Sequence, residues 1–330
     1  MWIWTRASSA SSTGPMASIQ APNRPVRLAL VGAGRWGRVI LRNLAGMQGA
    51  VLAAVASGSP ETAGLVPVGC PVFAHWRDML AAGGFDGVVI ATPPASHAEI
   101  AEAVMSHGLA VLIEKPLTLD LGEALALRDT AIRHGALVQV GHVHLAAPAW
   151  RRLKALVGEI GPVREIHAVA GNHGPYRSDA TVLWDWGPHD IALCLDLLGQ
   201  PPDRVEARLL ARRNVAADVT SGMAERLRLD LGFGVVAADI ILGTDMDKTR
   251  RFEVVCHGGT LVYDDLSAAK LTLDGIEMGV AADPPLGIQL REFAAAIGAG
   301  SRDISGLDLG IAVVEVLGRC QSSLVAAEGL

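Results

Sequence analysis

The sequence predicts an α/β protein with a doubly wound parallel sheet, followed by an α+β domain with a mainly antiparallel, open sheet. Two observations support this prediction. In the first half, continuously apolar runs alternate with stretches whose apolar residues recur at helical spacing, as in a parallel sheet covered on both faces. After about residue 147, strand-like runs follow one another without intervening helices, as in an antiparallel sheet.

The first domain, residues 25–146, contains five continuously apolar runs that predict buried strands. Such runs suit a parallel sheet, because helices cover both of its faces. Stretches at helical spacing separate them, most clearly at 96–108 and 120–134. The strands are expected at 27–34, 51–57, 87–94, 110–117 and 137–142.

The second domain, residues 147–330, begins with a helix at 148–157 and a strand at 163–171. The run 235–242 is mostly apolar on both faces, whereas a sheet with one wet face alternates. We therefore expect a homodimer or homotetramer formed through this sheet. Further strands are expected at 204–212, 224–231, 252–259, 260–265 and 270–275, and closing helices at 286–299 and 308–325.

The N-terminal residues 1–24 are rich in Ser, Ala and Pro and lack periodicity. This pattern predicts a disordered N-terminal extension, or a natural start nearer to Met16.

The overall composition limits the class of partner. Of the 330 residues, 50% are hydrophobic and 19% are charged, which is typical of a globular protein. The net charge of −6 gives no electrostatic reason to expect nucleic acid or an anionic membrane. The apolar runs are too short to span a bilayer. The four cysteines form no CxxC pair, so we expect free thiols in a reducing cytoplasm.

A glycine-rich turn joins the first predicted strand to a helix. Gly32, Gly34 and Gly37 have the GxGxxG spacing, in the strand–turn–helix context that dinucleotide binding requires. Gly32 permits the tight turn, Gly34 lets a pyrophosphate approach the backbone, and Gly37 allows close helix packing. Arg35 and Trp36 lie in the same loop and are assigned to the cofactor site. A plain glycine turn is the alternative.

The end of the second strand bears on the choice of cofactor. An acidic residue there would bind the adenosine ribose, but the sequence reads Ser57-Gly58-Ser59, with no carboxylate before Glu61. Without that charge a 2′-phosphate is not repelled, and Arg35 could face it. The sequence therefore allows NAD or NADP and does not choose between them.

Polar residues follow the third and fourth strands, at the edge where ligands of such sheets bind. Thr92 and Pro93 end the third strand, and His97 follows them. Glu114 and Lys115 end the fourth strand. We assign all five to the cofactor site. The alternative for His97 is a helix-start residue with a satisfied imidazole, and for Lys115 a solvated strand end.

The segment LWDWGPHDIALCLDLLG, residues 183–199, places Asp185 and His189 before a long apolar run. A purely structural explanation is that Pro188 fits the first turn of a helix and Asp185 caps its free amides. The chemical explanation is that His189 accepts a proton, while Asp185 orients the ring by accepting an imidazole N–H. A first-turn position would keep His189 neutral, because the helix dipole disfavours another positive charge.

The stretches GAGRWG, ATPPASH, EKPL and WDWGPHD, in this order, resemble the Gfo/Idh/MocA family of NAD(P)-dependent oxidoreductases over nearly the whole chain from Val26. The resemblance implies a Rossmann domain, an open-sheet second domain that also mediates assembly, and hydride exchange between nicotinamide and a sugar, polyol or nucleotide-sugar carbon. It places the catalytic residues at Lys115, Asp185 and His189. Ser57 departs from the family pattern, since NAD-using members often have an aspartate there.

Around these residues we expect a shell that binds sugar hydroxyls. His142 ends a strand, and Asn172 and Arg177 precede the DWGPH segment, where Arg177 could also bind a phosphate or carboxylate. Loop solvation or capping is the alternative for each of them. Trp184 and Trp186 are expected to pack in the core. No metal-ligand spacing is complete, and the chemistry does not require a metal.

Two other functions stay open on the sequence alone. Transient oxidation of a sugar could serve elimination or epimerisation with a tightly held cofactor, and the absence of net nicotinamide reduction would identify it. A non-catalytic, cofactor-binding sensor is the second, although a sensor has no need of Lys115, Asp185 and His189 together.

Overall fold

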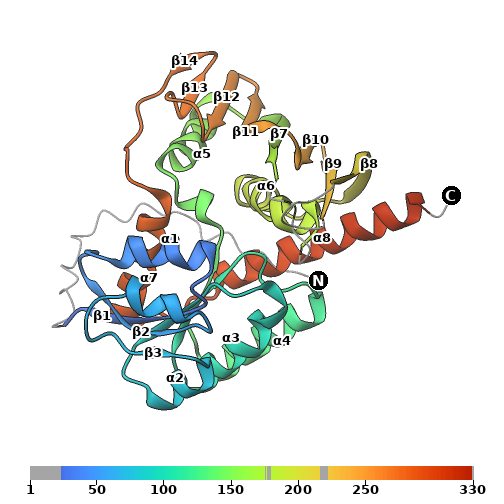
Figure 1. The fold of residues 1–330 in the computed structure, drawn as a ribbon. Helices are drawn as coiled ribbons and strands as arrows, with labels where there is room; N and C mark the ends of the chain where they lie inside the picture. The colour runs from blue at the N-terminus through green and yellow to red at the C-terminus, as the bar shows by residue number, and fades with distance from the viewer. Residues whose placement is uncertain (1–23, 175, 177–179, 216–221, 329–330) are drawn as a thin grey trace.

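The computed structural model describes residues 24–174, 176, 180–215 and 222–328. Figure 1 shows two sheet-containing units, formed by successive parts of the chain, with the long C-terminal helix running between them. Of the predicted extension 1–24, only Arg24 lies within the described residues. Its guanidinium donates two hydrogen bonds, of 2.9 and 2.7 Å, to the carboxylate of Asp86.

The first sheet has six parallel strands in the order β3-β2-β1-β4-β5-β6, which confirms the predicted doubly wound sheet. Its central strand is buried on both faces, since Leu28, Ala29 and Leu30 are all 0% exposed. The strands are β1 (Val26–Val31), β2 (Ala50–Ala56), β3 (Val72–Phe73), β4 (Gly87–Ile90), β5 (Ala110–Glu114) and β6 (Val138–Gly141). The intervening helices and 3₁₀ turns are α1 (Arg35–Leu44), η1 (Pro60–Leu65), α2 (Trp76–Ala82), η2 (Pro94–Ser96), α3 (His97–Ser106) and α4 (Leu121–His134).

The second sheet has eight strands in the order β14-β13-β12-β11-β7-β10-β9-β8. Its neighbouring strands are antiparallel except β7 and β10, which run parallel, so the sheet is mixed and mainly antiparallel, as predicted. Its strands are β7 (Val163–His173), β8 (Arg204–Val215), β9 (Gly222–Phe233), β10 (Val236–Gly243), β11 (Asp245–Cys256), β12 (Gly259–Asp264), β13 (Leu271–Leu273) and β14 (Ile276–Glu277). The helices and the 3₁₀ turn of this half are η3 (Val143–Ala146), α5 (Pro148–Ile160), α6 (Val182–Leu198), α7 (Pro285–Gly298) and α8 (Ser305–Glu328).

The two last helices return to the first sheet. Leu290 and Phe293 of α7 pack in one core with Leu30, and Ile311 of α8 packs in another with Ile113. Helix α8 also contacts α6 and β8 of the second unit. The predicted second domain, 147–330, therefore includes two helices that help to complete the first core.

One helix of the described residues is long and apolar enough to cross a membrane by length and composition alone. It is the Ser305–Ala326 part of α8, and 44% of that window is buried inside the protein. Apolar residues along this helix pack in both cores, with Leu317 in the core of the second unit and Ile311 in a core of the first (Figure 1).

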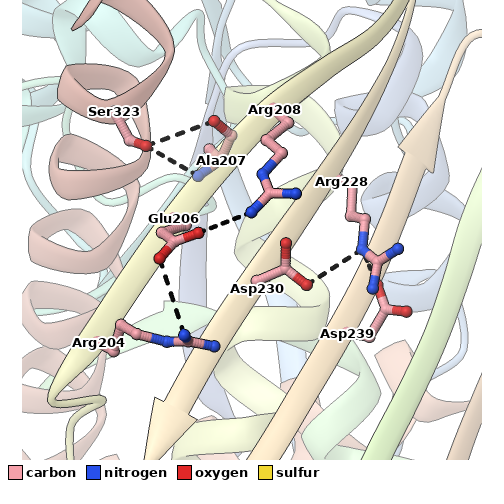
Figure 2. Close-up of polar contacts among 8 residues, drawn as sticks. All are labelled: Arg204, Glu206, Ala207, Arg208, Arg228, Asp230, Asp239 and Ser323. Carbon is pink, nitrogen blue, oxygen red and sulfur yellow. Dashed lines mark hydrogen bonds and ion pairs between the residues drawn. The ribbon is translucent and has the colours of Figure 1, made fainter. Parts of the chain in front are cut away.

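The outer face of the second sheet carries paired charges (Figure 2). Glu206 of β8 binds Arg208 at 2.9 Å, and Arg228 of β9 lies 3.1 Å from Asp239 of β10. On the outer face of β10, Ala237 and Ile241 are apolar, as expected, but Asp239 between them carries a charge. Val235 lies outside β10 and is 98% exposed, and Asp239 occupies the middle of that face.

Candidate active site

The glycine loop fits the pyrophosphate of a dinucleotide. A Cβ on Gly32 would lie 2.6 Å from the carbonyl oxygen of Ala91, and one on Gly37 would lie 2.0 Å from that of Gly32. Neither position tolerates a side chain. Gly34, by contrast, has no atom within 4 Å of a Cβ position, and it precedes the uncapped first turn of α1. That open space beside free helix amides is what an anionic phosphate requires.

The end of β2 has no carboxylate, as the sequence indicated. The hydroxyl of Ser57 accepts hydrogen bonds from the amide of Ser59, at 3.2 Å, and from the hydroxyl of the buried Thr62, at 2.8 Å. Glu61 instead binds Arg38 of α1 at 2.9 Å. At the end of β2, where the adenosine ribose is expected, the polar side chains are thus hydroxyl groups. We call this place the ribose edge; the nearby Glu61 is already paired with Arg38.

Glu114 connects the end of β5 to the glycine loop. Its carboxylate accepts hydrogen bonds from Trp36 Nε1, at 2.6 Å, and from the amide of Lys115, at 3.2 Å. Gly141 of the adjacent strand leaves room for it, because a Cβ there would lie 2.8 Å from the carboxylate. Burial raises the pKa of Glu114 to about 7, against the opposing effect of its hydrogen bonds. The Trp36–Glu114 hydrogen bond therefore joins the end of β5 to the start of α1.

His97 is fully buried and joins two loops of the crevice. Its Nδ1 lies 2.9 Å from the carbonyl oxygen of Pro116, and its Nε2 lies 2.9 Å from that of Thr92. The hydroxyl of Thr92 in turn accepts a hydrogen bond from Ser96. Burial lowers the pKa of the imidazole. These contacts match the alternative expected for His97, a satisfied imidazole at the start of a helix. Thr92 and Pro93 follow β4 at the carboxyl edge of the sheet.

Lys115 reaches from the first unit to the second. Its ammonium donates hydrogen bonds to the backbone oxygen of Asp185, at 2.7 Å, and to the carboxylate of Asp185, at 3.1 Å. Both side chains are 17% exposed, so the pair is well shielded from solvent. The contact fixes the ammonium where the sheet edge meets α6.

The helix that carries the DWGPH segment begins earlier than predicted. Helix α6 starts at Val182, and Pro188 lies inside it. The expected first-turn position of His189, and the capping role of Asp185, are therefore wrong. An interior proline has no N–H for the carbonyl one turn back and loosens the helix there. The backbone oxygen of Asp185, which accepts a hydrogen bond from Lys115, lies in this turn of the helix.

His189 is kept neutral by its surroundings rather than by the helix dipole. Burial lowers its pKa well below the usual range, and the nearby charges of Lys115 and Arg250 lower it further. Asp185, which we expected to orient the ring, contacts the ammonium of Lys115. The buried Nδ1 of His189 has no hydrogen-bond partner among the described residues.

A cluster of polar side chains surrounds His189 at the junction of the two units. The His144 ring packs edge-on against that of His189, with centroids 5.0 Å apart, and its Nδ1 lies 3.1 Å from the hydroxyl of Tyr263. Burial lowers the pKa of His142 to about 3 and raises that of Asp190 to about 6. We call this set the polar cluster; it consists of His142, His144, Trp186, His189, Asp190, Arg250 and Tyr263.

The remaining predicted substrate residues are only partly placed. Asn172 is the last residue but one of β7 and is in phase with the buried Ala168 and Ala170, so it continues the inner face of the sheet. Its side-chain oxygen accepts a 2.9 Å hydrogen bond from the amide of His173. Arg177 lies outside the described residues. Among the described residues, no group of three His, Cys, Asp or Glu side chains is placed to hold a metal ion.

Sequence reasoning missed Arg250 and Tyr263, although a signal for both exists. Arg250 is in phase with Phe252 and Val254, the buried positions of β11, so alternation places an arginine on the inner face. Tyr263 alternates in the same way with the buried Leu261 of β12. A charged residue in a buried phase of a strand is the pattern that could have identified this site.

Two family profiles match the chain in succession. The NAD-binding Rossmann fold of an oxidoreductase family matches residues 26–142, and the GFO/IDH/MocA C-terminal domain matches residues 150–262. Inositol 2-dehydrogenase 4 of Saccharopolyspora erythraea is 30% identical over 254 residues, which cover 72% of this chain and 73% of that protein. The chain belongs to the Gfo/Idh/MocA family. It is thus an oxidoreductase with an NAD-binding Rossmann domain.

The chain is also similar to a second curated protein and to a solved structure. UDP-N-acetylglucosamine 3-dehydrogenase of Acidithiobacillus ferrooxidans is 32% identical over 199 residues, 59% of this chain and 62% of that protein. A solved structure from Magnetospirillum magnetotacticum MS-1, described no further than as an oxidoreductase, has a TM-score of 0.85 and 44% identity. That match covers 90% of this chain and 100% of the other.

Proposed function

We propose that this protein transfers a hydride between NAD or NADP and a secondary-alcohol carbon of a sugar, polyol or nucleotide sugar. The contact of Lys115 with Asp185, beside the neutral His189, is the observation that carries the proposal. It brings an ammonium and a proton acceptor together at the edge of a dinucleotide crevice. The names of the inositol and UDP-N-acetylglucosamine dehydrogenases support the substrate class.

In the proposed reaction, the alcohol oxygen lies between Lys115 and His189. When bound, the nicotinamide supplies the acceptor for the hydride that leaves the carbon. His189 takes the hydroxyl proton, for which a neutral imidazole is required. Lys115 donates a hydrogen bond to the same oxygen, which stabilises the negative charge that develops there. Asp185 acts as a positioning residue, because its backbone and side-chain oxygens hold the ammonium.

The cofactor would be held mainly by backbone. Gly32, Gly34 and Gly37 shape the pyrophosphate site at the start of α1, while Trp36 and Glu114 bound the crevice on the side of Lys115. NADP is a candidate as well as NAD, because Ser57 and its neighbouring hydroxyls present no negative charge to a 2′-phosphate.

Purified protein incubated with each cofactor and a panel of sugars, polyols and UDP-sugars tests the proposal. We expect net formation of reduced nicotinamide with at least one member of the panel, and none without it. A product formed without net reduction would favour elimination or epimerisation instead. Tight cofactor binding with neither reduction nor product across the panel would contradict an enzymatic function.

We also propose that the protein is a homodimer or homotetramer through the outer face of the second sheet. The ion pairs on that face compensate one another, so a second copy can cover them without leaving an unpaired charge (Figure 2). Ile241 and Val169 add apolar surface beside an open groove of about 610 Å³. Light scattering at micromolar concentration should give at least a dimer, and a monomer would contradict the proposal.

The cytoplasm is the proposed location. Free thiols suit a reducing compartment, and all four cysteines are unpaired. Fractionation of cells that express the protein tests this placement; recovery with the periplasmic or membrane fraction would contradict it.

A further inference from the structure

An arginine on the inner face of the second sheet makes no hydrogen bond with its guanidinium among the described residues. The Arg250 side chain is 14% exposed, and its buried Nη1 has no partner. Arginine stays charged in proteins and carries five N–H donors, so burial without acceptors is costly. The buried guanidinium therefore requires hydrogen-bond acceptors beyond those that the described residues provide.

The neighbours of Arg250 hold the guanidinium in place without satisfying it. Its Cζ lies 5.1 Å from the ring centroid of Trp186, which restrains the plane of the guanidinium. The nearest carboxylate oxygen, Oδ2 of Asp190, is 4.0 Å from Nη1, too far for a hydrogen bond. That oxygen also lacks a hydrogen-bond partner, and Asp190 as a whole is only 1% exposed. Asp190 therefore offsets the positive charge of Arg250 but accepts no hydrogen bond from its guanidinium.

Other groups of the polar cluster also lack hydrogen-bond partners. Trp186 Nε1, which can only donate, is buried without a partner. Both ring nitrogens of His142 and the Nδ1 of His189 are unpartnered, and each neutral imidazole carries one N–H. A neutral imidazole also carries one acceptor nitrogen, so His142 adds one donor and one acceptor. With two N–H on Arg250 Nη1, one on Trp186 Nε1 and one on His142, the donors still outnumber these acceptors and the carboxylate oxygen. A ligand that satisfies the cluster must supply acceptor oxygens.

We propose that the polar cluster binds a carboxylate of the substrate, with Arg250 as its main partner. This inference rests on the proposed function, since it assigns a substrate class to the same site. The planar guanidinium matches the two coplanar oxygens of a carboxylate. A phosphate, with up to two charges, would be repelled more strongly by Asp190 beside the same guanidinium. The substrate class is a hydroxy acid or sugar acid, with its alcohol carbon toward Lys115.

Binding of matched acids and neutral compounds tests the inference. D-glucuronate is compared with D-glucose, D-galacturonate with D-galactose, and D-gluconate with D-glucitol, by calorimetry on the full chain saturated with cofactor. We expect at least one acid to bind about 10–100-fold more tightly than its neutral counterpart, the range of a charged hydrogen-bonded pair. Arg250→Met should remove that preference. The inference is overturned if no acid is preferred, or if the preference survives in Arg250→Met.

Two variants control for misfolding of Arg250→Met. Arg250→Lys keeps the charge but loses the two-pronged geometry, so a reduced preference for the acid is expected. Arg251→Gln changes the neighbouring residue, whose side chain is 47% exposed on the outer face and binds Glu253. This variant should keep the full preference. Cofactor affinity measured on all three variants verifies that the first unit is folded.

Turnover in the same samples separates this inference from the proposed function. Arg250-dependent binding of an acid, with no reduction of either cofactor by any compound, would support the carboxylate site and contradict the proposed hydride transfer. Reduction with neutral sugars, without any preference for acids, would support the hydride transfer and overturn the carboxylate site.

Discussion

In the cofactor crevice, Glu114 accepts hydrogen bonds from Trp36 and from the amide of Lys115, whereas in the polar cluster both ring nitrogens of His142 are buried without a partner. The contrast is general for the two regions. Of the eight buried polar atoms that lack a partner in the described residues, six belong to the polar cluster. The crevice is thus built mainly from backbone and satisfied side chains, whereas the cluster retains polar groups that a substrate could satisfy.

The two regions also contain buried groups whose protonation affects the stability of the fold differently. In the crevice, burial raises the pKa of the acidic Glu114 to about 7, so the neutral form is favoured. In the cluster, burial and the neighbouring cations hold the pKa values of His142, His144 and His189 below the usual range, so the neutral form is again favoured. Glu114 and these three histidines therefore change stability with pH in opposite directions.

The largest expected effect lies in the cluster. His189→Ala should lower kcat by roughly 10²–10⁴, the range typical of a lost general base. Cofactor affinity should stay nearly constant, because the crevice does not include His189. Stopped-flow turnover and cofactor titration of the same variant provide the measurement. His167→Ala is the control, since His167 lies on the exposed outer face beside Glu165. Full activity of His189→Ala would refute the catalytic assignment.

In the crevice, two glycines should respond differently to the same substitution. Gly34→Ala should leave the melting temperature nearly unchanged, because a Cβ there meets no atom within 4 Å. It should weaken binding of NAD and NADP by about tenfold or more, since the methyl group occupies the space of the pyrophosphate. Gly37→Ala should instead destabilise the fold, by about 1–3 kcal/mol or more, because its Cβ would lie 2.0 Å from the oxygen of Gly32.

Calorimetry and thermal unfolding of both glycine variants distinguish these outcomes. Wild-type affinity in Gly34→Ala for both cofactors would show that the pyrophosphate does not approach the loop at this point.

The ribose edge of the crevice should determine cofactor preference more weakly. The unmodified protein should bind NAD less than a hundredfold more tightly than NADP, a difference below about 2.7 kcal/mol. Ser57→Asp should shift the ratio toward NAD by about tenfold, since a carboxylate repels a 2′-phosphate and can bind the ribose. Ser57→Ala, which adds no charge, should leave the ratio unchanged. An unaltered ratio in Ser57→Asp would place the 2′ position elsewhere.

The smallest expected effect concerns stability in acid. A histidine in the unfolded chain titrates near its ordinary pKa of 6.5, but folded His142 has a pKa of about 3. Between these values the unfolded chain binds the additional proton, so stability is full above 6.5 and falls as the pH decreases. His142→Met should reduce that slope by up to about 1.4 kcal/mol per pH unit. Urea unfolding from about pH 7 to about pH 5 measures it. Parallel curves for the variant and the unmodified protein would contradict the buried, neutral state of His142.

Much of the crevice could be read from the sequence because its signals are local. The spacing of Gly32, Gly34 and Gly37 determines the turn, and the continuous apolar runs on either side predict strands buried in a parallel sheet. The absence of an acidic residue at Ser57 is likewise visible without coordinates. Two short elements, β3 and α2, contain too few residues for a period to develop and were not predicted.

The position of α6 shows where local reasoning fails. Proline at 188 favours a helix start there, yet α6 begins at Val182, because Val182, Leu183 and Ile191 are buried in the second core. Packing of these side chains outweighs the local cost of an interior proline. That start moves His189 away from the helix terminus, so burial and the charges of Lys115 and Arg250 lower its pKa instead.

The sequence by itself determined the two sheet types and the glycine loop, because each depends on spacing along one segment. It also made Lys115, Asp185 and His189 candidates, through the resemblance of their motifs to the Gfo/Idh/MocA family. Only the tertiary structure decided that Asp185 binds Lys115, and that Arg250 from β11 lies over Trp186 from α6. These contacts join residues about 65 to 70 positions apart across separate elements. No local period encodes them, since they form only when both cores have assembled.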